Sequence, residues 1–288
     1  MNKNLKSATL LLAVLALFMA SCTGAKTGNT TGETATEAEA DGIKTLTLDG
    51  GVTVTWIKDN AADHSMKREI FPDATDELIA DLGLADGIPA SVSTFLVESG
   101  GIKVLFDTGL GADDSQLLPA LASLGIAPED VEYLYITHYH GDHRGGMMRG
   151  DTVVFPNAQV YVSRVEHEAW MAMPADKNAL QTRCMEAYGS QLRMFEFGDT
   201  LPGNIVAIAA VGHTPGHTVF QAGQLLIIAD IIHGAALQLN HPEICPVFDM
   251  DKEAAIEARQ RILKYADENN LTMAGMHLPA PAFIESLP

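Results

Sequence analysis

The stretch Thr137-His138-Tyr139-His140-Gly141-Asp142-His143-Arg144-Gly145-Gly146 places three histidines and one aspartate close together in the chain. It follows the apolar run 131–136, which predicts a buried strand that leads into a polar loop. In an extended segment His138 and His140 lie on one side and can bind a single ion, and Asp142 and His143 can serve a second. Imidazole nitrogen and carboxylate oxygen are ligands that zinc prefers. The stretch therefore predicts a metal site just beyond a strand.

Composition limits the class of protein. The chain has 288 residues, of which 47% are hydrophobic and 19% charged, and this suits a globular domain with a substantial core. The formal net charge is −19, and a negative surface of this kind disfavours nucleic acid as a partner. Cys22, Cys184 and Cys245 are far apart and form no metal or redox motif. Cys184 and Cys245 could pair or remain free.

The N-terminal residues predict export. Residues 1–22 have the pattern of a signal peptide, because Lys3 and Lys6 precede a short apolar run at 8–18. Met19-Ala20-Ser21-Cys22 resembles the bacterial lipoprotein box, with Met where Leu is commoner, so Cys22 would carry a lipid anchor. An ordinary secretory signal is the alternative. Residues 23–42 have no large apolar side chain and predict a flexible linker. We expect a cell-envelope protein anchored to the outer membrane.

The rest of the chain, residues 43–288, predicts one domain in which strands and helices alternate. We expect an irregular segment at 58–87 with a short helix near 76–82. Further helices are expected at 114–124, 166–173, 177–194 and 253–266 from their apolar spacing. Strands are expected at 90–98, 103–106, 131–136, 205–211, 224–228 and 271–274.

Polar residues suited to metal binding follow several of these strands. Asp107 follows the strand at 103–106, and His213 and His217 flank a Thr-Pro-Gly turn after the strand at 205–211. Asp230 follows an apolar strand, where a lone carboxylate is costly unless it is paired or bound to a cation. His277 follows the last strand. We expect these loops to converge at one edge of a sheet, and only one of His213 and His217 to bind metal.

The combination of His-x-His-x-Asp-His at 138–143, Thr-Pro-Gly-His at 214–217, Asp230 and His277 resembles the metallo-β-lactamase-fold hydrolases. The resemblance covers residues 43–288 and includes Phe106-Asp107-Thr108-Gly109. It implies an α/β fold, a four-layer αββα sandwich, with two divalent metal ions. Zinc is the default, and iron, manganese and cobalt would suit the same ligands. By this resemblance the first ion is held by His138, His140 and His217, the second by Asp142, His143 and His277, and Asp230 bridges them.

Within the family, residues 155–158, 212–218 and 246–279 look most like the methyl parathion hydrolase and quorum-quenching lactonase branch. The resemblance implies attack of a metal-bound hydroxide on a small lactone, ester or phosphotriester, with Asp142 taking or passing a proton. Lactonases of the superfamily have a tyrosine three residues after the bridging aspartate. This chain has His233 there, and we expect His233 to face the substrate. His213 is expected to support the site without binding metal.

Two other functions compete with this prediction. One is β-lactam hydrolysis, which is disfavoured because many true β-lactamases of this fold have Cys at the position of Asp230. The other is a non-catalytic metal-binding lipoprotein, which the complete ligand set with both Asp142 and Asp230 disfavours. The natural substrate depends on the shape of the pocket and the oligomeric state is left open, because neither follows from the fold.

Overall fold

The computed structural model describes residues 42–287. The predicted signal peptide, with Cys22, and all of the predicted linker except Gly42 lie outside the described residues. No helix within residues 42–287 is both long enough and apolar enough to span a membrane. Cys184 and Cys245 are both buried and free, which answers the question of whether they pair.

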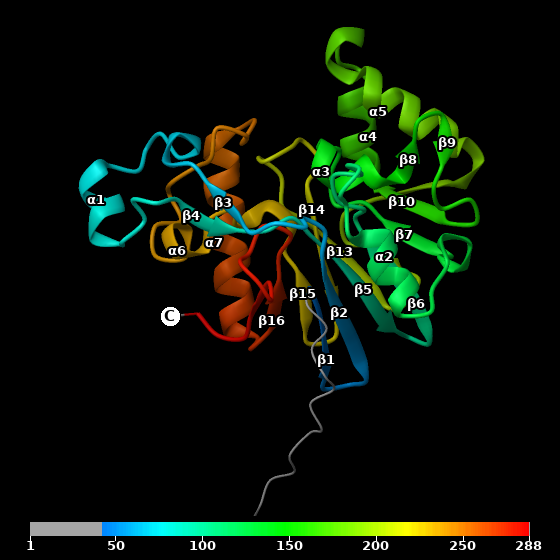
Figure 1. The fold of residues 1–288 in the computed structure, drawn as a ribbon, viewed down its shortest axis with the longest axis horizontal. Helices are drawn as coiled ribbons and strands as arrows, with labels where there is room; N and C mark the ends of the chain where they lie inside the picture. The colour runs from blue at the N-terminus through cyan, green and yellow to red at the C-terminus, as the bar shows by residue number, and fades with distance from the viewer. Residues whose placement is uncertain (1–41, 288) are drawn as a thin grey trace, which may run out of the picture. The chain divides into compact units, whose positions relative to one another are not determined.

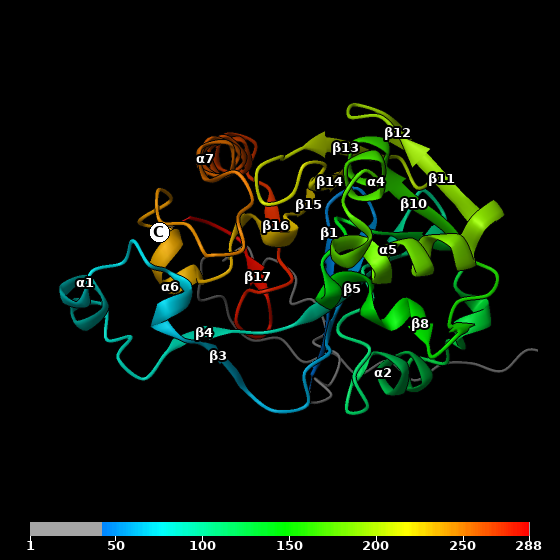
Figure 2. The same cartoon turned by 90° about the horizontal axis from the view of Figure 1, so that it is seen from above.

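Two β-sheets face each other at the centre of the domain (Figures 1 and 2). The first sheet has seven strands in the order β1-β2-β5-β6-β7-β10-β11. Their bounds are β1 Ile43–Leu48, β2 Val52–Lys58, β5 Ser93–Ser99, β6 Ile102–Phe106, β7 Tyr133–Tyr135, β10 Gln159–Ser163 and β11 Leu192–Phe195.

The second sheet has six strands in the order β12-β13-β14-β15-β16-β17. Their bounds are β12 Thr200–Leu201, β13 Ile205–Ala209, β14 Thr218–Ala222, β15 Leu225–Ile227, β16 Thr272–Ala274 and β17 Phe283–Ile284. Two further sheets have two antiparallel strands each: β3 His64–Met66 with β4 Ile88–Ala90, and β8 Met148–Arg149 with β9 Thr152–Val153.

Helices cover the outer face of each sheet. Helices α2 (Leu117–Ser123), α4 (Arg164–Met171) and α5 (Ala175–Tyr188) pack on the first sheet, and α7 (Lys252–Glu268) packs on the second (Figures 1 and 2). Asp251 begins α7 by accepting a hydrogen bond from Ala254 N at 3.1 Å. The remaining helices are short: α1 Asp76–Asp81, α3 Gly141–Arg144 and α6 Ala235–Gln238. This arrangement confirms the predicted four-layer αββα sandwich.

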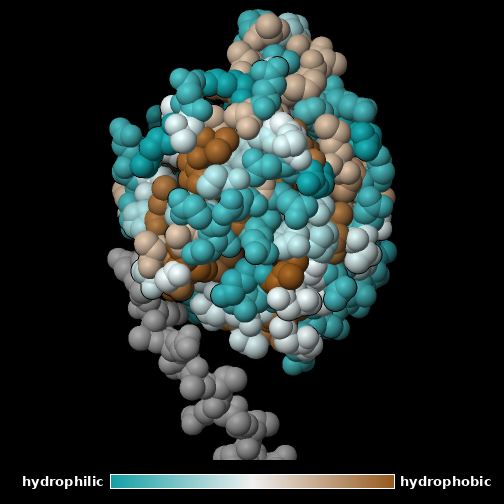
Figure 3. Space-filling view, turned by 90° about the vertical axis from the view of Figure 1, so that its right-hand side faces the viewer, coloured by the Kyte–Doolittle hydropathy of each residue, from teal (hydrophilic) through white to brown (hydrophobic). Residues whose placement is uncertain are grey.

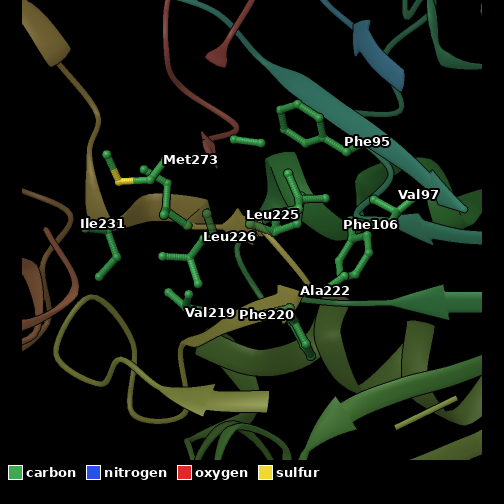
Figure 4. Packing of buried hydrophobic residues seen from close by; sticks show 14 of the residues in the cluster. Phe95, Val97, Phe106, Val219, Phe220, Ala222, Leu225, Leu226, Ile231 and Met273 are labelled. Carbon is green, nitrogen blue, oxygen red and sulfur yellow. The ribbon is translucent and has the colours of Figure 1, made fainter. Parts of the chain in front are cut away.

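Alternation along the strands of the first sheet creates the two apolar layers that hold this sandwich together. In β6, Val104 and Phe106 point into the space between the sheets, and Leu105 points outward to the helices. Figure 4 shows Phe106 and Phe220 among the side chains of the layer between the sheets. Their rings pack edge to face at 5.3 Å, in the geometry that aromatic pairs prefer.

The predicted helix at 177–194 is too long. Helix α5 ends at Tyr188, and residues 192–195 form the edge strand β11, which pairs in parallel with β10. Gly189 follows the helix with φ +34°, a conformation that disfavours helix continuation and costs glycine little. The predicted short helix near 76–82 is confirmed as α1, and its N-cap Thr75 accepts from Leu78 N at 3.1 Å.

Candidate metal centre

The site lies where two pairs of parallel strands end. In the first sheet Phe106 of β6 pairs with Tyr135 of β7, and in the second sheet Ile227 of β15 pairs with Ala274 of β16. Because the paired strands end together, the loops that follow them start side by side. These loops carry every ligand predicted from the sequence except His217, which precedes β14. The structure brings three groups of side chains to ligand distance: His138, His140, His213 and Asp230; Asp142, His143 and His277; and Asp230, His233 and His277.

Asp230 lies at the centre of the cluster. Its carboxylate is buried, and Oδ2 lies 3.1 Å from His213 Nε2, 3.3 Å from His277 Nε2 and 3.6 Å from His138 Nε2. Oδ1 lies 3.1 Å from His143 Nε2. One carboxylate therefore faces imidazole nitrogens from both ends of the cluster, which is the position of a shared ligand.

His143 is oriented by a second aspartate. Its Nδ1 donates to Asp107 Oδ2 at 2.7 Å, and this orients the ring so that Nε2 faces Asp230. Asp107 also accepts from Thr137 N and Thr137 Oγ1, both at 2.8 Å, so the first residue of the histidine loop is held by the same carboxylate. His143 Nε2 and Asp230 Oδ1 are both buried without a hydrogen-bond partner. Burial alone lowers the pKa of His143, but Asp230, Asp142 and Asp107 raise it well above its usual value, so this buried pair needs a proton or a cation between its two atoms.

His277 and Asp142 complete the same side of the cluster. His277 Nδ1 donates to the Ser91 carbonyl at 2.9 Å, which turns Nε2 towards Asp142 Oδ2 at 3.2 Å. Burial lowers the pKa of His277, but Asp230 and Asp142 more than offset this effect and raise it to about 10. Asp142 is partly exposed, with 29% of its side chain accessible, whereas His277 and Asp230 are buried. It lies on the single-turn helix α3, whereas the sequence predicted a loop.

His213 is oriented in the way expected of a metal ligand. Its Nδ1 donates to Asp249 Oδ1 at 2.8 Å, and its Nε2 lies 2.9 Å from His140 Nδ1. Asp249 is held in turn by the buried Arg259 of α7, whose Nη2 donates to Asp249 Oδ2 at 3.0 Å. The Nε of Arg259 donates to the Ile231 carbonyl at 2.7 Å, next to Asp230 in the chain. One buried guanidinium thus supports both His213 and the Asp230 loop.

His217 lies outside all three groups. Its Nδ1 donates to the Ala210 carbonyl at 3.1 Å, and its Nε2 accepts from Asp230 N at 3.1 Å. Both ring nitrogens are therefore engaged with backbone, and neither is left for a metal. This geometry opposes the prediction that His217 binds metal and His213 only supports the site. In the structure His213 faces the cluster, and His217 holds the backbone of Asp230.

His138 and His140 come from the opening stretch of the histidine loop and meet at the centre. His138 Nδ1 lies 3.0 Å from Thr137 Oγ1, and its Nε2 lies 3.1 Å from His140 Nδ1. Burial lowers the pKa of His138 well below its usual value and lowers that of His140 to about 3. Both imidazoles are therefore neutral at physiological pH, and neutral imidazole is the form that binds metal.

His233 also faces the cluster. Its Nε2 lies 3.1 Å from Asp230 Oδ2, and its ring stacks on that of His277 with 5.1 Å between centroids. Burial lowers the pKa of His233 to about 4. Its Nδ1 is buried and has no hydrogen-bond partner. The centroid of the Phe248 ring lies 6.0 Å from that of His233.

The cluster forms one wall of a cavity of about 860 Å³. Asp142, Asp230, His233 and His277 line it on the polar side. The other walls are largely apolar and include Met66, Ile70, Leu110, Met148, Leu180 and Phe248. Elsewhere on the domain, on the face shown in Figure 3, hydrophilic residues cover much of the surface and apolar residues lie between them in small groups.

The other histidines have separate roles. His64 of β3 lines the cavity, so the irregular segment at 58–87 borders the site. His167 is half-buried and contacts the Tyr139 hydroxyl at 3.0 Å, and His241 pairs with Glu243 at 3.2 Å in a loop. The roles of Asp249 and Arg259 were not predicted from the sequence. Only the fold brings Asp249 to His213 and Arg259 to Asp249.

The residues present fit a pair of divalent metal ions. The side chains that meet there offer only imidazole nitrogens and carboxylate oxygens. Two of these atoms, His143 Nε2 and Asp230 Oδ1, are buried, have no hydrogen-bond partner and belong to different groups. Four of the ligand imidazoles have one nitrogen held by a protein oxygen, from Thr137, Asp107, Asp249 or Ser91. This is the second layer of contacts that metal-binding histidines usually have.

Comparisons with known proteins agree with this geometry. The most similar curated relatives include the N-acyl homoserine lactonase AttM of Agrobacterium fabrum, which is 29% identical over 185 residues, 58% of this chain. That match spans 65% of the relative's length, so the chain covers slightly less than two thirds of it. The N-acyl homoserine lactonase AiiA of Bacillus thuringiensis subsp. kurstaki is 24% identical over 155 residues, 52% of this chain and 57% of the relative.

Solved structures match over more of the chain. The hydrolase AbOPH, of the beta lactamase superfamily, is 27% identical with a TM-score of 0.75, over 86% of this chain and 94% of that one. AidC, a dizinc quorum-quenching lactonase in complex with a product, is 26% identical with a TM-score of 0.75, over 84% and 92%. The family described as the metallo-beta-lactamase superfamily matches residues 87–277. This chain therefore belongs to the metallo-β-lactamase superfamily.

Proposed function

We propose that the protein is a dinuclear metal-dependent hydrolase that acts on a small lactone. The observation that carries this proposal is the pair of ligand groups that share Asp230 at the wall of a largely apolar cavity. Two divalent ions at such a site, when bound, act as Lewis acids and make water nucleophilic at neutral pH. Zinc is the metal that we propose, because the related AidC is a dizinc lactonase.

The proposed ligands follow the geometry of the site. His138, His140 and His213 would hold one ion, and Asp142, His143 and His277 the other. Asp230 would be shared between them, since its two oxygens face imidazoles of both sets. A shared anion offsets the mutual repulsion of two cations at close range. His217 is proposed as a residue that positions Asp230 through its backbone.

The cavity favours a substrate with an apolar part. Its apolar walls would take an alkyl or acyl chain, and the reacting carbonyl would then lie against the ligand wall. The similarity to lactonases supports a lactone ring as the reacting group. Simple esters and phosphotriesters present the same kind of polarised oxygen and are the next substrates to test.

We propose that Asp142 transfers a proton during the reaction and that His233 contacts the substrate. Asp142 is the most exposed carboxylate of the cluster, and the neighbouring His143 and His277 hold its pKa below the usual range despite burial. It is therefore ionised and can accept a proton from an attacking water or pass it to the leaving oxygen. His233 lines the cavity beside the ligand groups, and its Nε2, 3.1 Å from Asp230 Oδ2, is the nitrogen that we propose to contact the substrate.

The ligand assignment predicts different metal contents for two matched variants. His213→Gln should bind about one metal per chain instead of about two, because it loses an imidazole that faces Asp230. His217→Gln should keep both ions, since it changes only contacts to backbone. The measurement is elemental analysis of each protein after dialysis against a weak chelator. Metal loss from His217→Gln with full occupancy in His213→Gln would reverse the assignment.

The proposed activity predicts that the purified protein hydrolyses lactones and loses this activity on chelation. The panel contains N-acyl homoserine lactones of several chain lengths, an aryl ester, a phosphotriester and nitrocefin. Longer acyl chains should lower KM, because they bury more apolar surface in the cavity. Faster turnover of nitrocefin than of any lactone would favour a β-lactamase. No turnover of the panel by protein with two bound metals would contradict the hydrolase proposal.

The proposed role of His233 predicts a catalytic defect without metal loss. His233→Phe keeps an aromatic ring against His277 and Phe248 but removes both nitrogens. We expect kcat/KM to fall about 10²-fold, the lower end of what a positioned proton donor or acceptor contributes. His241→Phe is the control, because His241 lies in an exposed loop contact with Glu243. Unchanged kcat/KM in His233→Phe at full metal occupancy would remove His233 from the mechanism.

A further inference from the structure

Glu166 is a buried carboxylate that belongs to none of the three ligand groups. It lies on α4, and its side chain is 1% exposed. Ser163 caps the same helix and accepts from Glu166 N at 3.4 Å, so the residue is held in the first turn. An isolated carboxylate is costly to bury unless it is paired or fully hydrogen-bonded. Its surroundings show which of these applies.

Four donors meet the two oxygens of Glu166. Oε1 accepts from Tyr139 N at 2.8 Å and from Trp170 Nε1 at 2.7 Å. Oε2 accepts from Thr214 Oγ1 at 2.8 Å and from Gly216 N at 2.7 Å. Burial raises the pKa of Glu166, and these hydrogen bonds offset only part of the rise. Two backbone amides and an indole can only donate, so the arrangement suits an ionised carboxylate with all its acceptor sites used.

Three of these donors come from the two loops that carry His138, His140 and His213, and the fourth, Trp170, lies on α4 itself. Tyr139 lies between His138 and His140 in the chain, and Thr214 directly follows His213. The two loops belong to different sheets, because one follows β7 and the other follows β13. Each oxygen of Glu166 binds one loop, so the carboxylate sets the distance between them.

Trp170 gives Glu166 a third connection to the ligands. The indole held by Oε1 packs edge to face against the imidazole of His140, with 5.9 Å between ring centroids. The approach of α4 to the His213 loop is also close. A Cβ at position 216 would lie 2.1 Å from Glu166 N, so only glycine fits there. The helix, the aromatic neighbour of His140 and both loops thus meet at one side chain.

We propose that Glu166 is a positioning residue that holds the His138–His140 segment and His213 at the spacing needed to bind one metal ion. This inference rests on the ligand set of the proposed function. Glu166 contacts no ligand side chain itself and acts through the backbone of both loops and through Trp170. It should therefore affect affinity for the ion held by His138, His140 and His213 more than affinity for the other ion.

The test is the variant Glu166→Gln in metal-stripped full-length protein. Glutamine keeps the size of the side chain, but its amide nitrogen donates and would face two donors in place of an acceptor oxygen, in either orientation of the amide. The control is Glu168→Gln, which makes the same change of charge at an exposed position of α4. Zinc binding is measured by titration against a competing chelator, with the cobalt absorption spectrum as a report on ligand geometry.

To separate the two ions, Glu166→Gln and Glu168→Gln are also made in two backgrounds. His277→Gln weakens the site of Asp142, His143 and His277, and His140→Gln weakens the site of His138, His140 and His213. In His277→Gln, Glu166→Gln should raise the dissociation constant for zinc about 10–100-fold, the usual effect of losing a contact behind a ligand. In His140→Gln the same change should have little effect, and Glu168→Gln should have little effect in either. Equal weakening in both backgrounds would overturn the proposal, because it would indicate a general loss of structure.

A milder variant covers the case in which Glu166→Gln does not fold. Thr214→Val has nearly the same shape and removes only one of the four donors. It should raise the dissociation constant of the same ion several-fold, and unchanged binding would contradict the proposal. If the parent protein binds no metal, the proposed function fails. If the parent and Glu166→Gln both bind two ions equally well, only the role of Glu166 fails.

Discussion

The structure of the site depends on the burial of one carboxylate among imidazole nitrogens. Asp230 is 2% exposed, and ring nitrogens of His138, His143, His213 and His277 surround its two oxygens. Such a carboxylate is costly to bury without positive charge nearby, and the lone pairs that face it add to the cost. Protons on some of these imidazoles offset the charge in the metal-free protein, and the raised pKa of His277 reflects this. Two divalent ions would offset it more completely.

The two-sheet architecture provides the loops that meet at Asp230. Paired parallel strands end together in each sheet, and the sheets pack face to face, so loops from both reach the same place. A second layer of polar residues then orients the ligands. Asp107 and Asp249 each accept from the far nitrogen of a histidine, while Glu166 connects loops of the two sheets. The packed helices α4 and α7 contribute Glu166 and Arg259, so the outer layers support the site as well.

Much of this could be predicted from the sequence, because histidines and aspartates just beyond strands form a local pattern. The His-x-His-x-Asp-His stretch, Asp230 and His277 were placed in this way, and the four-layer sandwich followed from the resemblance. The choice between His213 and His217 could not be made locally, since both flank the same turn. It depends on Asp249, 36 residues after His213, and on the Ala210 carbonyl. The end of α5 was missed for a similar reason, because β11 forms only by pairing with β10.

We propose that two metal ions share Asp230 and that His213 binds one of them. Anomalous diffraction from zinc-loaded crystals, recorded on both sides of the zinc absorption edge, tests it directly. We predict two anomalous peaks roughly 3.5–4 Å apart, the spacing of two-metal sites, with one oxygen of Asp230 at each. One peak should lie about 2.0–2.1 Å from His213 Nε2, the usual zinc–nitrogen distance. A single peak, or a peak at that distance from His217 with none near His213, would contradict the account.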